Sequence, residues 1–239
     1  MTEKQPATRK VSLQPILWSS FLYIIGLLLV FAYLYPRVQE FIESSQIPTP
    51  EVSILPILAY FFGMVVIIGV VLFLIPVSKL KYVFRVLFGL LYAWGIFIIL
   101  NLILPPPAAI GIAAALGLLW LFWPFIWLQN LLLLLALASV GAVFGAVVSP
   151  WTLVWVLLAI SIYDIVAVSL GYMMWMAKKL SETDTLPAFI LPRRLRDWKL
   201  NLRGASFQKL FETESAERDF SLLGGGDIGF PLIFVASVF

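Results

Sequence analysis

Cysteine and histidine are both absent from this 239-residue chain. Without cysteine the chain can form neither a disulfide nor a thiolate metal site, and its redox compartment is left open. Without histidine it cannot hold zinc through a pair of His ligands, and it lacks the imidazole base that a Ser-His hydrolase needs. Those classes of enzyme are therefore excluded, and we expect no metal and no cofactor.

Charged residues are also scarce: they make up only 12% of the chain, whereas hydrophobic residues make up 62%. A soluble domain is nearer half apolar and a quarter charged, so this balance indicates a membrane protein. Apolar runs of about 20 residues, long enough to cross a bilayer, cover most of the sequence. We predict an all-α, polytopic transmembrane helix bundle with about seven spans, at residues 14–35, 52–77, 84–104, 107–123, 126–148, 151–176 and 220–239. The count falls to six if the short segment 107–123 is re-entrant.

These spans divide the chain into a tail at 1–13, a six-helix bundle at 14–176, a loop at 177–219 and a seventh span at 220–239. Basic residues fall on alternate sides of the membrane, with three in the tail and nine of the sixteen Lys and Arg in the loop. The positive-inside rule then predicts that the N-terminus and the loop are cytoplasmic. Because seven acids accompany the nine bases of the loop, its charge is mixed, and we expect no nucleic-acid partner.

Within the loop, the segment LPAFILP at 186–192 is apolar and has basic flanks. Such a segment can lie on the membrane surface, with its apolar residues down and its basic neighbours among lipid head groups. A disordered linker is the alternative, and the sequence does not choose between the two.

Two patterns inside the bundle concern helix packing rather than chemistry. Trp120, Trp123 and Trp127 cluster around a proline, and we interpret them as an aromatic belt at the membrane interface. Gly141 and Gly145 are four residues apart, a spacing that predicts a close contact between two helices.

Two acidic residues, Asp164 and Asp227, lie within apolar runs and have no basic partner in any predicted span. A charged side chain at the centre of a bilayer costs about 2.5–3.5 kcal/mol on insertion scales, so such residues are usually functional. If two helices bring these carboxyls together, they share one proton, because like charges a few ångströms apart cannot both ionise. Such a pair can activate a water for amide hydrolysis, with one carboxyl as base and the other as acid.

Three consecutive glycines, Gly224, Gly225 and Gly226, precede Asp227. Each glycine in a helix interior costs roughly 0.5–1 kcal/mol relative to alanine, so helix is disfavoured at this point. Pro231 also disturbs the helical hydrogen bonds around Asp227. An extended substrate could pair with main chain exposed here, although a kinked helix in close contact with another helix explains the same glycines.

The pair Tyr163–Asp164 in one span, a long loop, and GGGD at 224–227 opening the next span together resemble the presenilin and signal-peptide-peptidase family of intramembrane aspartyl proteases. The resemblance implies that Asp164 and Asp227 are the catalytic pair, that Tyr163 supports the first acid, and that Gly224 and Gly226 are required. It also implies two further helices, the last with a Pro-Ala-Leu motif. That tripeptide is absent from these 239 residues, so we expect the chain to lack its final two helices.

The leading hypothesis is therefore an aspartic endopeptidase that cuts transmembrane segments or remnant signal peptides in the lipid bilayer. A prepilin-peptidase-like enzyme has the same chemistry but cuts near the membrane boundary. Asp164 lies about twelve residues from either end of its predicted span, which favours the deeper cut. A proton-coupled transporter or ion leak that uses both acids as a relay is the alternative of another class, and an inactive assembly subunit is a third.

Overall fold

The computed structural model describes residues 14–45, 53–183, 185–202 and 220–239. Five of the helices are long and apolar enough to cross a membrane, and two shorter apolar helices, Pro106–Phe122 and Gly225–Val238, accompany them. The chain is thus an all-α polytopic helical protein, as predicted. The tail at 1–13 and much of the predicted loop, 203–219, lie outside the described residues.

The first span is one continuous stretch of helix, Gln14–Ser44, longer than the predicted 14–35. It consists of α1 (Gln14–Leu29), a π-helical turn (Val30–Leu34) and α2 (Tyr35–Ser44). The π turn precedes Pro36, whose nitrogen cannot donate to the helical ladder. The remaining helices are α3 (Ile54–Leu74), α4 (Val77–Asn101), α5 (Pro106–Phe122), α6 (Ile126–Val147), α7 (Pro150–Ser169), α8 (Tyr172–Ser181) and α10 (Gly225–Val238).

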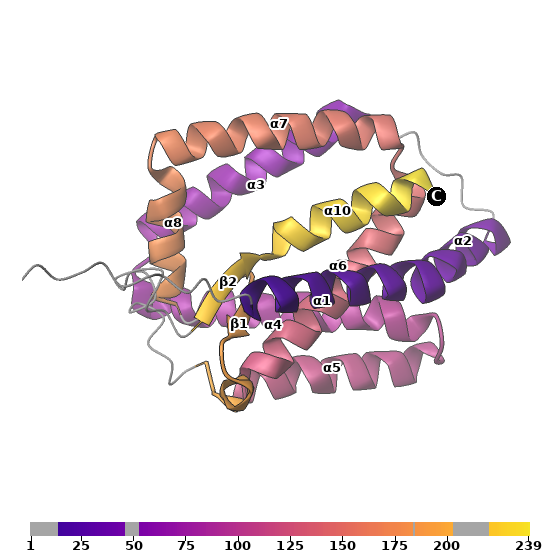
Figure 1. Ribbon diagram of the computed structural model, residues 1–239, viewed down its shortest axis with the longest axis horizontal. Coiled ribbons are helices and arrows are strands. Elements are labelled where there is room, and N and C mark those ends of the chain that lie inside the picture. Colours follow the sequence, from indigo (N-terminus) through magenta and orange to yellow (C-terminus); the bar gives the residue numbers. More distant parts are fainter. Residues whose placement is uncertain (1–13, 46–52, 184, 203–219) are drawn as a thin grey trace, which may run out of the picture.

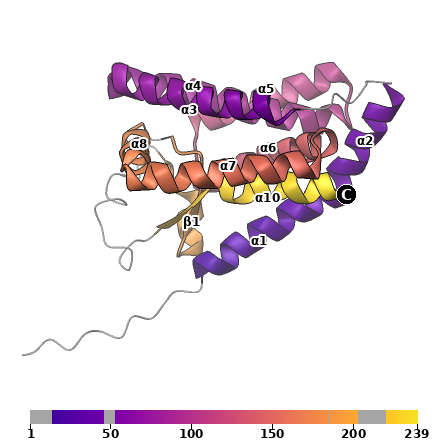
Figure 2. The ribbon, with the colours of Figure 1, turned by 90° about the horizontal axis from the view of Figure 1, so that it is seen from above.

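Figure 1 shows α3 and α7 along one edge of the bundle and α4 and α5 along the opposite edge, with α6 and α10 between them. The closest associations are those of α10 with α6 and of α4 with α5 and α6. In the perpendicular view, α1 lies on one side of α10 and approaches it toward the C-terminal end, and α2 continues past that end (Figure 2). The helix α10 is therefore held by α6 and flanked by both the first and the sixth predicted spans.

Small residues bring α6 and α10 together. A Cβ added to Gly141 would lie 3.2 Å from the Cβ of Leu232, and one added to Gly145 would overlap Ala236. The predicted close contact at these two glycines is confirmed, and the partner helix is α10. The aromatic belt needs one correction, because Trp120 is only 2% exposed and belongs to the core, whereas Trp123 and Trp127 are exposed.

The sixth predicted span, 151–176, is two helices that meet at Gly171. This residue has φ +71°, a left-handed conformation that glycine adopts without steric cost, and α8 turns away from α7 there (Figure 1). Asp164 consequently lies only five residues before Ser169, where α7 ends. The prediction that Asp164 is at the middle of its span was wrong. The depth of Asp164 in the membrane therefore no longer favours a protease that cuts within the membrane over a prepilin-peptidase-like enzyme that cuts near its boundary.

The apolar segment at 186–192 is neither a membrane-surface segment nor a linker. Its residues Ala188–Pro192 form a strand, β1, that pairs antiparallel with β2 (Phe220–Gly224), and Phe189, Ile190 and Leu191 are buried. The stretch after β1 also contacts the bundle, because Leu202 N donates to Pro124 O and Ile126 N donates to Leu200 O. This part of the predicted loop is thus folded onto the start of α6, and the seventh helix begins at Gly225 rather than at residue 220. The prediction that helix is disfavoured at all three glycines was wrong for Gly225 and Gly226, because they lie in the first turn of α10 and not in a helix interior.

Candidate functional site

Asp227 lies in the first turn of α10, directly after β2 ends. Gly224 is the residue that caps the helix, and its N–H donates to Oδ2 of Asp227 at 3.1 Å. A carboxylate at this third helical position satisfies a backbone donor that would otherwise be unpaired, and it lies at the positive end of the helix dipole. The side chain of Asp227 is exposed, so its orientation is defined by the turn while its carboxylate remains accessible.

The three glycines before Asp227 have different surroundings. Gly224 and Gly226 are exposed, whereas Gly225 is buried. A Cβ added to Gly225 would lie 3.1 Å from the carbonyl oxygen of Pro187, and Gly225 N donates to that same oxygen at 3.0 Å. A Cβ added to Gly224 would lie equally close to Oδ2 of Asp227, but that atom is at the end of a side chain. The contact that cannot yield is therefore at Gly225, whereas the resemblance points to its two neighbours.

Asp164 and Tyr163 lie on α7, and both are half-buried. The ring of Tyr163 packs edge-on against Phe61 and Phe62 of α3, with both centroid distances 5.8 Å. These contacts hold α7 against α3 one residue before the acid. Tyr163 is thus placed to fix the part of α7 that carries Asp164.

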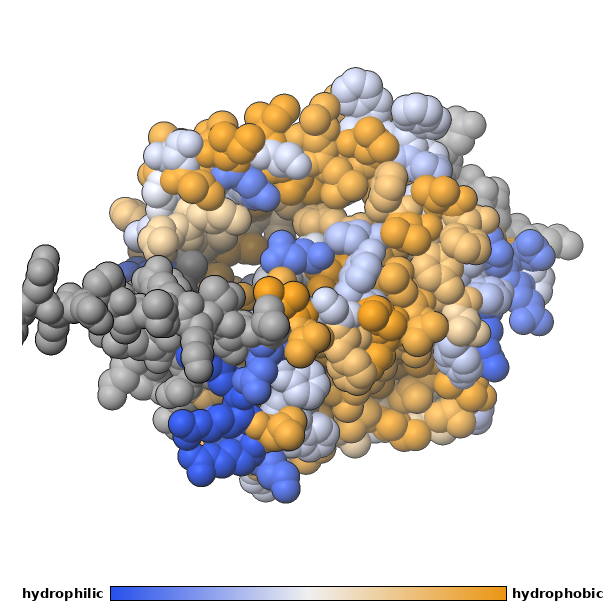
Figure 3. All heavy atoms as spheres, viewed as in Figure 1, coloured by the Kyte–Doolittle hydropathy of each residue, from blue (hydrophilic) through white to orange (hydrophobic). Residues whose placement is uncertain are grey.

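The two acids are on two neighbouring helices, α7 and α10. The helix α10 contacts α7, yet none of the hydrogen bonds among the described residues joins the two carboxyl groups. Figure 3 shows an opening in this face of the molecule between the region of α7 above and that of α10 below. The structure therefore places the acid-bearing elements on two sides of one opening without direct contact between the acids. No group of three or more Asp or Glu that could hold a metal ion occurs in the described ranges.

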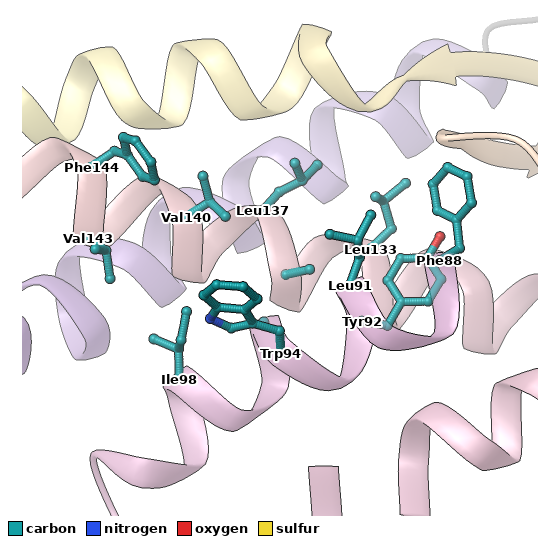
Figure 4. Close-up of a pocket in the computed structure, with 12 residues that line it drawn as sticks. Phe88, Leu91, Tyr92, Trp94, Ile98, Leu133, Leu137, Val140, Val143 and Phe144 are labelled. Atoms are coloured by element: carbon teal, nitrogen blue, oxygen red, sulfur yellow. The ribbon is translucent and has the colours of Figure 1, made fainter. Parts of the chain in front are cut away.

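An apolar cavity of about 410 Å³ lies between α4 and α6, lined by residues that include Trp94, Ile98, Leu137, Val140 and Phe144. Figure 4 shows the side chains of Trp94 and Ile98 on α4 facing those of Val140 and Phe144 on α6. Leu137 also approaches the start of α10: a Cβ added to Gly229 would lie 3.0 Å from one of its methyl carbons. Leu137 thus contacts both the cavity and α10, although the residues that line the cavity all belong to α4 and α6.

Two polar residues that the sequence analysis did not single out are Gln129 and Asn130 at the start of α6. Each is 2% exposed, and each makes hydrogen bonds through both ends of its amide. The signal was present in the sequence, because adjacent amides in WLQNLLLLL interrupt an apolar run as the two aspartates do.

The fold and the site define a polytopic membrane protein in which two acidic residues lie on helices that border a common opening. A model of the family described as signal-peptide peptidase, presenilin aspartyl protease matches residues 52–239, a range that includes Asp164 and Asp227. The chain belongs to this family. No curated protein and no solved structure gives a significant match to the chain.

Proposed function

We propose that the chain is an intramembrane-cleaving aspartyl protease and that Asp164 and Asp227 are its catalytic pair. The observation that carries the proposal is the match to an aspartyl-protease family over a range that includes both acids. The positions of α7 and α10 on either side of one opening are consistent with it (Figure 3).

In the proposed reaction, one carboxyl is ionised and the other is protonated. The ionised carboxylate takes a proton from a water molecule as the water oxygen attacks the carbonyl carbon of the scissile amide. The protonated carboxyl donates to the carbonyl oxygen, which gives a neutral tetrahedral intermediate. This intermediate collapses as the C–N bond breaks: the leaving nitrogen takes the proton that the first carboxyl removed from the water, and one hydroxyl of the intermediate returns its proton to the second carboxylate, which restores the starting protonation of the pair. The step needs both acids within reach of one water, and we propose that the opening between α7 and α10 narrows around the substrate to bring them there.

The proposed substrate is an apolar, membrane-spanning segment of another protein or a remnant signal peptide. A helical segment must unwind before its peptide bonds can be attacked, and an unwound segment needs partners for its backbone. The strand β2 leads directly into the turn that carries Asp227, and among the described strands its one partner is β1. The other edge of β2 can therefore accept an extended substrate through main-chain hydrogen bonds, while the cavity between α4 and α6 can receive apolar side chains.

The proposed orientation follows the positive-inside rule, with the N-terminus and the region around β1 and β2 on the cytoplasmic side. In that arrangement Asp164, five residues from the end of α7, and Asp227, at the start of α10, both lie toward the cytoplasmic side of the bundle. Tyr163 supports Asp164 through its packing on α3, and the glycines at 224–226 shape the turn before Asp227.

The test is cleavage by the purified protein in liposomes of a labelled peptide that has a single apolar span, with fragment masses as the readout. Cuts inside the apolar span are expected. The transporter alternative predicts no fragments, together with a proton flux that depends on both acids, measured by a pH-sensitive dye in the same liposomes. That second pattern would overturn the proposal.

A further inference from the structure

The start of α6 carries two adjacent amide side chains, Gln129 and Asn130, inside the apolar bundle. A buried amide is costly unless its donors and acceptors are paired. Gln129 Oε1 accepts from the indole of Trp120 at 2.7 Å, and its Nε2 donates to the hydroxyl of Tyr92 at 2.7 Å and to Leu186 O at 3.1 Å. These bonds connect α4, α5 and α6 to the chain just before β1.

Asn130 binds the backbone of a single residue at the middle of β1. Its Nδ2 donates to Ile190 O at 2.7 Å, and its Oδ1 accepts from Ile190 N at 2.9 Å. A side-chain amide that pairs with both polar groups of one residue takes the place that a neighbouring strand would occupy. The amide of Asn130 thus fixes the register of β1 against α6, because it binds Ile190 and no other residue of the strand.

The position of β1 is passed on to Asp227 through backbone contacts. Ile190 is opposite Leu222 in the sheet, and Ala188 is opposite Gly224, the residue that caps α10. Pro187 O accepts from Gly225 N at 3.0 Å, and Gly224 N in turn donates to the Asp227 carboxylate. The pairing of Ala188 with Gly224 and the hydrogen bond from Gly225 N to Pro187 O join β1 and the residue before it to the start of α10, so a shift of β1 along α6 moves the turn that orients Asp227.

We propose that Asn130, supported by Gln129, is a positioning residue for Asp227. It touches neither substrate nor the reacting atoms, and it acts by holding β1, and through β1 the β2–α10 turn, at one place on α6. Its effect on catalysis rests on the proposed function. A displacement of about 1 Å can reduce a rate roughly 100-fold when the catalytic group must be aligned with its substrate.

The variant that tests this is Asn130→Leu, which is similar in size and removes both hydrogen bonds to Ile190. The matched control is Ser139→Ala. Ser139 is on the same helix and only 1% exposed, and its hydroxyl lies within hydrogen-bond distance of Gly95 O and Leu135 O, neither of which belongs to β1. Each variant removes a buried polar partner from α6, but only the first releases β1.

Two measurements are made on each variant in lipid. Hydrogen exchange detected by mass spectrometry reports the protection of residues 186–192 and 220–226, independently of activity. Peptide cleavage gives kcat and KM separately. We expect Asn130→Leu to speed exchange in both segments and to lower kcat by about 10- to 100-fold, with KM within about threefold of wild type. We expect Ser139→Ala to leave both the exchange of these segments and kcat close to wild type.

Unchanged exchange at 220–226 in Asn130→Leu would overturn the proposal, and so would faster exchange with an unchanged kcat, since Asn130 would then be a stabilising residue only. If Asn130→Leu does not fold, Asn130→Ala is used instead, because it removes both hydrogen bonds to Ile190 without adding bulk or charge. If the wild-type protein cleaves no peptide, the proposed function fails. The hydrogen-exchange measurement at residues 220–226 then decides by itself whether Asn130 holds the segment that leads into Asp227.

Discussion

At the scale of single residues, the carboxylate of Asp227 has a structural partner as well as its proposed catalytic role. The N–H of Gly224 donates to it, so removal of the whole side chain would disturb the start of α10 as well as the chemistry. Replacement by asparagine keeps an oxygen that can accept the same hydrogen bond. Asparagine is therefore the substitution that separates catalysis from folding at this position.

Gly225→Ala tests the packing of the turn. The added Cβ would lie 3.1 Å from Pro187 O, a backbone atom that cannot rotate away. We expect a lower thermal midpoint for the detergent-solubilised protein. The control is Gly63→Ala on α3, where nothing lies within 4 Å of the added Cβ and where alanine should be neutral or stabilising by about 0.5–1 kcal/mol. Equal midpoints for the two variants would contradict the crowding of Gly225.

Tyr163→Phe tests how Tyr163 supports Asp164. The substitution keeps the ring that packs on Phe61 and Phe62 and removes only the hydroxyl. If packing is the support, cleavage should stay within about threefold of wild type, whereas Tyr163→Ala, which removes the ring as well, should lower it further and lower the thermal midpoint of the protein, because the ring contacts with α3 are lost. A loss of activity in Tyr163→Phe as great as in Tyr163→Ala would assign the support to the hydroxyl instead.

At the scale of elements, the sequence predicted where most helices lie. It did not predict that α7 ends before Gly171 or that α10 begins only at Gly225. Apolar length identified the spans, because each helix must be apolar over about 20 residues to cross a bilayer. It did not reveal the bend at Gly171, since a single glycine in an apolar run is compatible with a continuous helix. Nor did it predict β1 and β2, because a buried strand has the same apolar composition as a helix and the paired residues lie 28 to 36 positions apart in the chain.

Gly171→Ala tests the bend between α7 and α8. The position has φ +71° and nothing within 4 Å of an added Cβ, so any effect arises from backbone conformation and not from crowding. A left-handed conformation costs a non-glycine residue about 1–2 kcal/mol, and we expect a corresponding loss of stability. Gly111→Ala in α5 has equally open surroundings without the positive φ. If Gly111→Ala lost as much stability as Gly171→Ala, the loss at Gly171 could not be assigned to its left-handed backbone.

At the scale of the whole molecule, α3, α7 and α8 form one side of the opening, and α6 and α10 form the other. The candidate acids were predictable from the sequence because ionised groups are rare in apolar spans. Their separation was not predictable, since it depends on how the two sides pack. The role of Asn130 was not predictable from the sequence either, because only the structure reveals that its amide is paired with β1.

The proposed reaction predicts that the opening narrows when substrate binds. Because the chain has no cysteine, spin labels can be placed at Ile165→Cys on α7 and Ser221→Cys on β2 without background. We expect their distance to shorten on addition of a span peptide whose scissile amide is replaced by a hydroxyethylene group, a mimic of the tetrahedral intermediate. A control pair at Leu90 and Leu118, exposed positions of α4 and α5, should not change. An unchanged distance in the first pair would count against closure.

The most direct test of the central claim compares Asp164→Asn, Asp227→Asn and the double variant with the wild-type protein, using fragment mass and initial rate on one span peptide. Residues that act as a unit are strongly non-additive. The account predicts that each single variant folds and still binds the peptide but makes no cut. It also predicts that the second substitution causes no further loss, so the double variant gives the same background rate as either single variant. Cleavage within the span that persists in Asp164→Asn or in Asp227→Asn would contradict it.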